Sequence, residues 1–400
     1  MEPTRRVVFP LVRVLDVAPD VDFMVKRLPV TVITGFLGAG KTTVLRHLLI
    51  SSGRKLAVMV NEFGSVGLDG DLIRSCGFCP DDELEGRLVE LNNGCLCCTV
   101  QDDFLPTMER LLKRVDQLDG IVVETSGLAL PRPLLQALDW PAIRSRVHVN
   151  GVITLVDGEA LAAGSPVSDP AALERQRQED PSIDHITAID ELFRDQLVAA
   201  DLVLISRADL IDTAQLHRLR GELEGQVRAG TAVLPVSNGS VDSAMVLGLD
   251  HHPQNHHDHD HDHDHDHDHD HDHDHDHDLH DHSHVAITGS NVRLEGRFDR
   301  AALEALMPDL VRDLQVVRLK GRVWLPGKTL PLQLQMVGPR LNSWFEAAPA
   351  SAWVPDQGTG VDLVLLALKD TAPSSFESAL QRLINATPVT ASSAASNPRG

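Results

Sequence analysis

The residues from 35 to 43 read GFLGAGKTT and directly follow an apolar, β-branched run at 30–33. A strand, a glycine-rich turn and the start of a helix form the context that a phosphate-binding P-loop requires. The glycines allow backbone amides to approach phosphate oxygens, and a helix that begins near Lys41 directs its positive end at them. Lys41 is expected to reach the β- and γ-phosphates, and the Thr42 hydroxyl to ligate Mg²⁺, which prefers hard oxygen ligands. The candidate residues of this motif are Gly35, Gly38, Gly40, Lys41 and Thr42.

A second candidate for the same site follows the apolar stretch at 120–124, which predicts a buried strand that ends in a carboxylate. Glu124 opens an acid-x-x-Gly turn that closes at Gly127. In P-loop proteins an acid at this place contacts Mg²⁺ directly or through water, and the glycine amide senses the γ-phosphate. The alternative is a helix cap after a core strand. The P-loop upstream favours the nucleotide-binding interpretation.

The loop from 206 to 209 reads Ser-Arg-Ala-Asp and occupies the place of a guanine-reading Asn/Thr-Lys-x-Asp loop. The Asp209 carboxylate can accept both N–H groups of the guanine edge, which adenine does not offer together. We therefore expect GTP rather than ATP. Arg207 replaces the usual lysine, and its stem can still lie on the base; this departure leaves ATP as an open alternative.

All five cysteines lie between positions 76 and 98, a crowding that in a reducing compartment favours metal binding or redox chemistry over structural disulfides. Cys95, Cys97 and Cys98 place three soft ligands within four residues. Three thiolates leave a tetrahedral site incomplete, as a site that must release its ion requires. We favour metal binding here over a redox or a buried structural role. Cys76 and Cys79 are equally compatible with further metal ligands and with a redox couple.

The net charge of −22 argues against nucleic-acid binding. Twelve of the acidic residues lie between Asp258 and Asp281 in an alternating His-Asp tract, so the rest of the chain carries a charge near −10. The imidazoles of this tract suit weak, fast-exchanging Co²⁺, Ni²⁺ or Zn²⁺. A metal-collecting role is favoured over a solvated spacer.

Apolar stretches alternate with amphipathic ones from about residue 30 to 236, which predicts an α/β domain of the P-loop NTPase type with a mostly parallel sheet. Its expected strands are 30–34, 56–60, 87–91, 120–124, 151–156, 201–205 and 232–236, and its expected helices are 41–51, 102–117, 131–138, 184–199 and 213–228. A smaller α+β unit is expected to follow, with strands at 291–296, 315–324, 330–337 and 361–368 and helices at 299–308 and 374–385.

These patterns divide the 400 residues into five parts. They are an N-terminal extension (1–27), the P-loop domain (28–247), a His/Asp-rich disordered linker (248–284), the C-terminal α+β domain (285–387) and a disordered tail (388–400). The chain lacks an apolar segment of membrane-spanning length, and its N-terminus lacks the basic-then-apolar order of a signal peptide. We therefore expect a cytoplasmic protein with no membrane partner.

Taken together, the motifs resemble those of the CobW family of P-loop GTPases. The resemblance covers about residues 28–387. It rests on GFLGAGKTT at 35–43, NEFGSVGLDG at 61–70, GCLCC at 94–98, ETSGLALP at 124–131 and SRAD at 206–209.

The resemblance implies phosphate binding by residues 38–43, which adds Ala39 and Thr43, and Mg²⁺ held by Thr42 with Glu124 or Glu62 nearby. It implies that the catalytic residues are Lys41, Thr42 and Glu124. Guanine is assigned to the loop of Ser206, Arg207 and Asp209, and a transition metal to Cys95, Cys97 and Cys98. Glu62 lies where a nucleotide-sensing switch loop begins and is a candidate for coupling the two ions.

The function that the resemblance implies is a GTP-dependent metallochaperone. It would hydrolyse GTP to GDP and phosphate and deliver Co²⁺ to a client, a cobalt chelatase of corrin synthesis. Residues 285–387 show no catalytic constellation in the sequence, and we assign them to partner docking by default. Three alternatives stay open. A zinc chaperone is one, because thiolates prefer Zn²⁺ to Co²⁺. The others are a metal store that uses the His-Asp tract and a GTP-driven loader of a cofactor.

Overall fold

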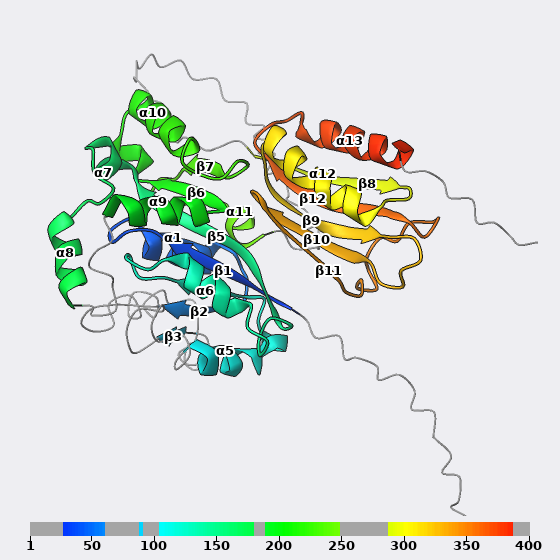
Figure 1. The fold of residues 1–400 in the computed structure, drawn as a ribbon, viewed down its shortest axis with the longest axis horizontal. Helices are drawn as coiled ribbons and strands as arrows, with labels where there is room; N and C mark the ends of the chain where they lie inside the picture. Colours follow the sequence, from blue (N-terminus) through cyan, green and yellow to red (C-terminus); the bar gives the residue numbers. More distant parts are fainter. Residues whose placement is uncertain (1–26, 61–87, 91–103, 180–188, 249–286, 387–400) are drawn as a thin grey trace, which may run out of the picture.

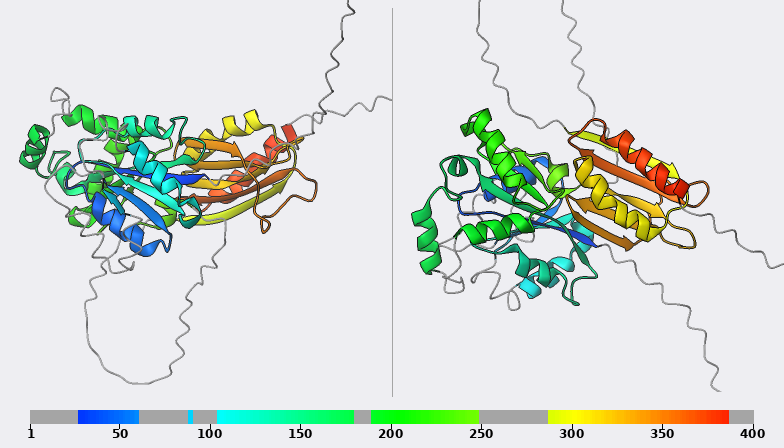
Figure 2. Two further views of the ribbon diagram at one scale, coloured as in Figure 1. Left: turned by 90° about the horizontal axis from the view of Figure 1, so that it is seen from below. Right: turned by 45° about the horizontal axis from the view of Figure 1, so that its top comes forward.

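The structure, a computed structural model, describes residues 27–60, 88–90, 104–179, 189–248 and 287–386. Within these ranges the chain forms two β-sheets, each with its own helices and hydrophobic core (Figure 1). We call the first sheet with its helices the N-terminal unit and the second the C-terminal unit. The two units lie side by side (Figure 2).

The first sheet has seven described strands in the order β3-β2-β4-β1-β5-β6-β7, and every neighbouring pair is parallel. The strands are β1 (Leu28–Thr34), β2 (Leu56–Val60), β3 (Leu88–Glu90), β4 (Gly120–Glu124), β5 (Val147–Asp157), β6 (Leu202–Ser206) and β7 (Ala232–Pro235). Parallel strands are covered on both faces, which explains why they read as continuous apolar runs in the sequence. The expected strand positions are confirmed, with ends that differ by a few residues.

Helices cover both faces of this sheet. Alternate residues of β1 divide between two cores: Ile33 packs with Leu45 and Leu48 of α1, and Val32 packs with Met108 of α5. The described helices of the N-terminal unit are α1 (Lys41–Ser51), α5 (Leu105–Leu112), α6 (Pro131–Leu138), α7 (Gly158–Ala162), α8 (Pro170–Glu179), α9 (Ile189–Ala199), α10 (Thr213–Glu224) and α11 (Ser243–Leu247), with 3-10 turns η2 (Val115–Gln117) and η3 (Ala208–Leu210).

The second sheet is antiparallel, in the order β11-β10-β9-β12-β8. Its elements are β8 (Thr288–Glu295), α12 (Arg300–Asp313), β9 (Val316–Trp324), β10 (Leu332–Val337), β11 (Arg340–Phe345), β12 (Gly360–Ala367) and α13 (Ala372–Ala386). Apolar side chains of α12 and α13 pack with Leu319, Leu334 and Leu363 in one core on one face of this sheet. The alternate residues of β9 and β10 therefore face away from these helices.

The sequence expectations differ from the structure at several places. The helix expected at 213–228 ends at Glu224, and α7, α8 and α11 were not expected. The helix expected at 102–117 is divided into α5 and η2. The helix expected to end at residue 308 continues to Asp313, because Met307 and Val311 are both buried in the core and hold the helix on either side of Pro308. Strand β11 was not expected, since its polar sequence shows no alternation; it pairs with β10 across the turn at Gly338.

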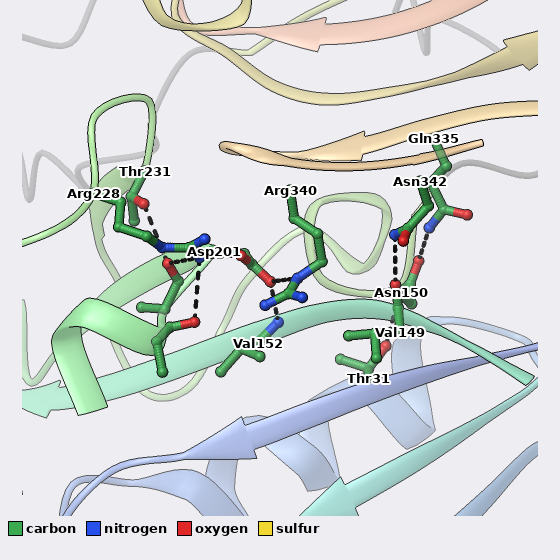
Figure 3. A network of polar contacts seen from close by, with 12 residues as sticks. Thr31, Val149, Asn150, Val152, Asp201, Arg228, Thr231, Gln335, Arg340 and Asn342 are labelled. Carbon is green, nitrogen blue, oxygen red and sulfur yellow. Dashed lines mark hydrogen bonds and ion pairs between the residues drawn. The ribbon is translucent and has the colours of Figure 1, made fainter. Parts of the chain in front are cut away.

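The two units meet through buried polar groups (Figure 3). Arg318 of β9 is only 2% exposed. Its guanidinium donates to the backbone carbonyls of Met245 (2.5 Å) and Val246 in α11, and to the backbone and side-chain oxygens of Asn150 (3.0 Å each). Gln335 of β10 also donates to the side chain of Asn150. Because α11 follows β7 in the chain, these bonds fasten the C-terminal unit to the end of the N-terminal unit.

A second contact is made at the amino end of β6. The carboxylate of Asp201 accepts hydrogen bonds from Arg340, from Arg228 and from the backbone N–H of Val152 (2.8 Å; Figure 3). All strands of the first sheet run in one direction, so the C-terminal unit docks near their amino ends. The P-loop follows the carboxyl end of β1, so it lies at the opposite ends of these strands. Within the described ranges, the helices are all too short or too polar to cross a bilayer.

Candidate nucleotide site

The loop between β1 and α1 has the backbone shape expected of a phosphate cradle. Its three glycines, Gly35, Gly38 and Gly40, all have positive φ angles. Gly40 is the N-cap of α1, and no side chain caps the first amide groups of this helix. Uncapped N–H groups at a helix N-terminus form a ready site for an anion, and the helix dipole adds to the attraction.

Lys41 and Thr42 occupy the first turn of α1. Lys41 is 8% exposed, and its Nζ donates to the carbonyl of Phe36 at 3.1 Å, so the ammonium group is held over the loop. The hydroxyl of Thr42 donates to Oε1 of Glu124 at 3.2 Å. Glu124 is the last residue of β4 and is 4% exposed. A hydroxyl and a carboxylate side by side are the hard oxygen donors that suit Mg²⁺, so these two residues fit such an ion.

The turn from 124 to 127 lies directly against the P-loop. The N–H of Thr125 donates to the carbonyl of Ile33 at 2.9 Å. At Gly127 a Cβ atom would come within 2.6 Å of the backbone nitrogen of Leu37, so a side chain has no room there. The turn and the P-loop therefore hold one another in place, as a turn that senses a phosphate bound in the loop requires.

Gln196 of α9 supports this turn and was not singled out by the sequence. The residue is fully buried, and its side-chain nitrogen donates to the carbonyls of Gly127 (3.3 Å) and Ala129 (3.2 Å). An amide on the otherwise apolar inner face of the helix at 189–199 was the available signal. The hydrogen bonds connect α9 to the segment that adjoins the P-loop.

The loop at 206–209 follows β6 at the same edge of the sheet. The hydroxyl of Ser206 donates to the carbonyl of Val156 at 3.2 Å. Arg207 has a positive φ of 53°, and its guanidinium lies 2.5 Å from the carboxylate of Asp157, the last residue of β5. This ion pair fixes the direction of the arginine stem. Asp209 is exposed at the surface of η3, where its carboxylate is accessible to a base.

A further loop at this edge, residues 236–240, was also not singled out by the sequence. The N–H of Ala208 donates to the carbonyl of Val236 at 3.3 Å, so this loop lies beside the 206–209 loop. A Cβ added at Gly239 would come within 2.8 Å of the Thr43 side chain, so it also touches α1. The signal was a Ser-Asn-Gly turn directly after a strand. The structure thus brings four loops together around the start of α1.

The transition-metal candidates lie outside the described residues. Glu62, Cys76 and Cys79 belong to the segment 61–87, and Cys95, Cys97 and Cys98 to the segment 91–103. The His-Asp tract lies in the segment 249–286. Among the residues that the structure does describe, there is no cluster of three or more His, Cys, Asp or Glu side chains with metal-binding geometry. The thiolate site remains a prediction from the sequence.

Comparison with known proteins gives the same family for both units. Residues 29–235 match the family model described as CobW/HypB/UreG, nucleotide-binding domain. Residues 287–384 match the model described as Cobalamin synthesis protein cobW C-terminal domain.

Two bacterial relatives match along most of the chain. A protein of Pseudomonas aeruginosa named Zinc chaperone CobW is 44% identical over 342 residues, which cover 85% of this chain and 87% of the relative. A protein of Sinorhizobium with the same name is 40% identical over 368 residues, which cover 90% and 98%. A crystal structure of Zn(II)-bound YjiA GTPase from E. coli covers 90% of this chain and 99% of that chain at 23% identity, with a TM-score of only 0.37. From the two family matches and the two close relatives, the chain belongs to the CobW/HypB/UreG family of P-loop GTPases.

Proposed function

We propose that this protein is a GTP-dependent zinc chaperone, in which nucleotide binding at the P-loop controls Zn²⁺ binding by Cys95, Cys97 and Cys98. The observation that carries the proposal is that the carboxyl ends of β2, β3 and β4 lie next to one another. Val60, the last residue of β2, pairs in register with Glu90 of β3 and with Glu124 of β4. All three strands therefore end side by side, at the edge where Thr42 meets Glu124.

This register supports coupling between the two ions. The segment that contains Glu62 leaves β2 at Val60, and the segment that contains the three thiols leaves β3 at Glu90. Both segments thus begin at the same edge as the phosphate-binding loop. Ligands of α/β sheets bind beyond the carboxyl ends of the strands, so a metal held by these segments would lie near the nucleotide.

The nucleotide chemistry is assigned to the residues around the start of α1. Lys41 would pair with the β- and γ-phosphates, and the uncapped amides of the loop would donate to their oxygens. Thr42 and Glu124 would hold Mg²⁺, which supplies positive charge to the phosphates during hydrolysis. Asp209 would accept the two N–H groups of guanine. Gly127 would report the γ-phosphate, because its backbone packs directly on the P-loop.

Zinc is proposed in place of the cobalt expected from the sequence. Thiolate ligands bind Zn²⁺ more tightly than Co²⁺ under the Irving–Williams order. The relatives at 44% and 40% identity are both named zinc chaperones. Nothing in the described residues favours Co²⁺, so cobalt delivery to a chelatase of corrin synthesis stays a prediction. The chemistry of a client protein also remains a prediction.

The test measures Zn²⁺ and Co²⁺ affinity by competition with a calibrated chelator, in Mg²⁺ plus a non-hydrolysable GTP analogue and in Mg²⁺ plus GDP. The full chain is compared with Cys97→Ser, and Cys79→Ser shows in addition whether the second cysteine pair supplies a further ligand. A chain without residues 256–284 removes the weak ions of the His-Asp tract. One tight Zn²⁺ that needs both the GTP analogue and Cys97 is the expected result.

Other outcomes would change the proposal. Affinity that is the same in both nucleotides would contradict nucleotide control. Many weak ions that vanish with residues 256–284 would favour the metal store. A tight site that prefers Co²⁺ under both conditions would restore the cobalt prediction.

A further inference from the structure

A cavity of about 420 Å³ lies between the two units, away from the nucleotide site. It is lined from the N-terminal unit by Arg27 and Arg54, which precede β1 and β2, and from the C-terminal unit by Lys320 and Arg322 of β9. The cavity is therefore near the amino ends of the parallel strands. At the rise of a β-strand, the seven residues of β1 separate it from the P-loop by roughly 20 Å.

The cations of β9 face this cavity because of strand alternation. Leu319 and Val323 pack on the helices of the C-terminal unit, so the alternate residues Lys320 and Arg322 lie on the other face of the sheet. That face carries Lys320 and Arg322, with Gln333 and Gln335 beside them on β10, and all four line the cavity. One side of the second sheet is thus an apolar core, and the other presents charges and amides to the N-terminal unit.

Three residues that line the cavity have a buried nitrogen without a hydrogen-bond partner. They are Arg322, whose side chain is almost completely buried at 5% exposure, Arg27 and His148. The atoms are Nε of each arginine and Nδ1 of the histidine. A buried donor that is left unsatisfied is costly, and such groups are rare in native proteins. Nε of an arginine is always a donor, whereas Nδ1 of a neutral histidine is a donor in only one tautomer. The two arginine atoms at one cavity therefore point to a ligand that accepts hydrogen bonds.

The balance of charge identifies the ligand as an anion. Four cationic side chains line the cavity against two carboxylates, Asp119 and Glu346, although the chain as a whole carries −22. Glu346 is engaged by the indole nitrogen of Trp344, which donates to it at 2.7 Å. The pKa of His148 reflects these positive surroundings: burial, together with the charges of Lys320 and Arg27, lowers it to about 3.

We propose that this cavity binds a small oxyanion with two or more negative charges, carried by phosphate or carboxylate groups, which contacts cations of both units at once. Arginine forks and lysine ammonium groups both form charge-assisted hydrogen bonds to such oxygens. The volume is within the range of small-molecule sites and too small for a folded partner. An anion held between Arg27 of one unit and Arg322 of the other would strengthen the contact between the units.

The test uses the full chain with Mg²⁺ and saturating GDP, so that the P-loop is filled. Inorganic phosphate and tricarballylate, a tricarboxylate, are titrated separately by isothermal calorimetry and by the fluorescence of Trp344, which lines the cavity. Trp344→Phe shows how much of the fluorescence change comes from this residue. Lys320→Gln is expected to weaken binding by about tenfold or more, because it removes a charged hydrogen-bond donor.

Lys328→Gln is the matched control, because it removes the same charge from an exposed position of the same unit outside the cavity. Binding of either anion that is weakened in Lys320→Gln and retained in Lys328→Gln supports the site. Binding of phosphate alone identifies the phosphate group as the recognised chemistry, and binding of tricarballylate alone identifies the carboxylate. Absence of saturable binding at millimolar concentration, or equal weakening by both substitutions, overturns the proposal. Neither result depends on zinc or on hydrolysis of GTP.

Arg322→Gln and Arg27→Gln provide a second comparison. Arg322 is buried, so its substitution is checked first by thermal unfolding of the GDP-bound chain. Arg27 lies in the other unit, and the proposal requires that its loss also weakens binding of the anion. If substitutions in only one unit weaken it, the anion does not bridge the units, and that part of the proposal fails.

Discussion

Arg340 of the C-terminal unit donates a hydrogen bond to Asp201 of the N-terminal unit, across 139 positions in the sequence. Asp201 is almost completely buried and is also bonded to Arg228 and to the backbone of Val152. A single carboxylate thus joins a helix-to-strand connection of the first sheet to the edge hairpin of the second. Its removal leaves two guanidinium groups without their anionic partner.

Asp201→Asn is expected to lower the free energy of unfolding by about 3 kcal/mol, because breaking one side of a buried ion pair leaves the other charge uncompensated. Scanning calorimetry of the purified variant measures the change. Asp356→Asn, at an exposed position of the C-terminal unit, is the control and should leave the transition unchanged. Equal transition temperatures for Asp201→Asn and the unmodified chain would show that the contact contributes little.

Thr42→Val is expected to reduce GTP hydrolysis by about a hundredfold, the cost typical of losing one preorganised group at a reacting centre. The variant keeps the shape of the side chain but loses the hydroxyl that lies 3.2 Å from Glu124. The Mg²⁺ concentration for half-maximal hydrolysis should rise at the same time. Thr213→Val, at the exposed start of α10, is the control. An unchanged Mg²⁺ requirement would remove Thr42 from the proposed ion site.

Asp209→Asn tests the choice of base. Asparagine presents an N–H donor where aspartate presents an acceptor, so the variant should lose affinity for GTP and gain affinity for XTP, whose ring carries a carbonyl at that edge. The affinity for GTP is expected to fall, and the affinity for XTP to rise, by about tenfold or more each. Competition among GTP, XTP and ATP measures both effects, with Asp195→Asn as an exposed control. If the unmodified chain binds ATP as tightly as GTP, the guanine assignment is wrong.

His148 predicts a dependence of stability on pH. Burial lowers its pKa from 6.5 to about 3, assisted by Lys320, Arg27 and Arg318, while a hydrogen bond with Gln335 opposes the shift. Between these two pH values the unfolded chain binds a proton that the folded chain does not bind. The contribution of His148 to the free energy of unfolding is therefore fully present above pH 6.5. It declines as the pH falls, by up to about 1.4 kcal/mol per pH unit.

Urea unfolding of the unmodified chain and of His148→Gln over this pH range measures the effect. The variant should lose less stability on acidification than the unmodified chain, and His217→Gln, at an exposed position on α10, should match the unmodified chain. Parallel pH profiles for all three chains would mean that His148 is not held neutral. A bound oxyanion should reduce the slope, because it offsets the charges of Lys320 and Arg27.

Much of the N-terminal unit could be predicted from local pattern. The expected strands at 56–60 and 120–124 and the helix at 41–51 have the same bounds as β2, β4 and α1. Strands buried on both faces and a glycine-rich turn before a helix leave their signal in consecutive residues, so no knowledge of distant partners is needed. The contact between Thr42 and Glu124 was also foreseeable, since Glu124 ends one parallel strand and Thr42 follows the loop after another, so both lie beyond the carboxyl ends of the strands.

Elements that depend on a partner were harder to predict. Strand β11 is half-exposed and polar, and it exists because β10 offers a neighbour six residues long. Helix α12 continues past Pro308 because the side chains of Met307 and Val311 are both buried in the hydrophobic core of the C-terminal unit. Gln196 has its role only because the fold places two carbonyls of the 127–129 turn beside its side chain. In each case the deciding energy comes from residues distant in sequence.

By itself, the sequence determined the family, the P-loop, the guanine-type loop and the run of cysteines, because each is a short motif whose residue types and spacing carry the chemistry. The tertiary structure alone decided that Arg27 and Arg322, almost three hundred positions apart, line one cavity, and that Asp201 meets Arg340. The physical reason is that strand alternation reveals which residues share a face but not which face of another sheet they meet. That choice depends on the packing of the whole chain.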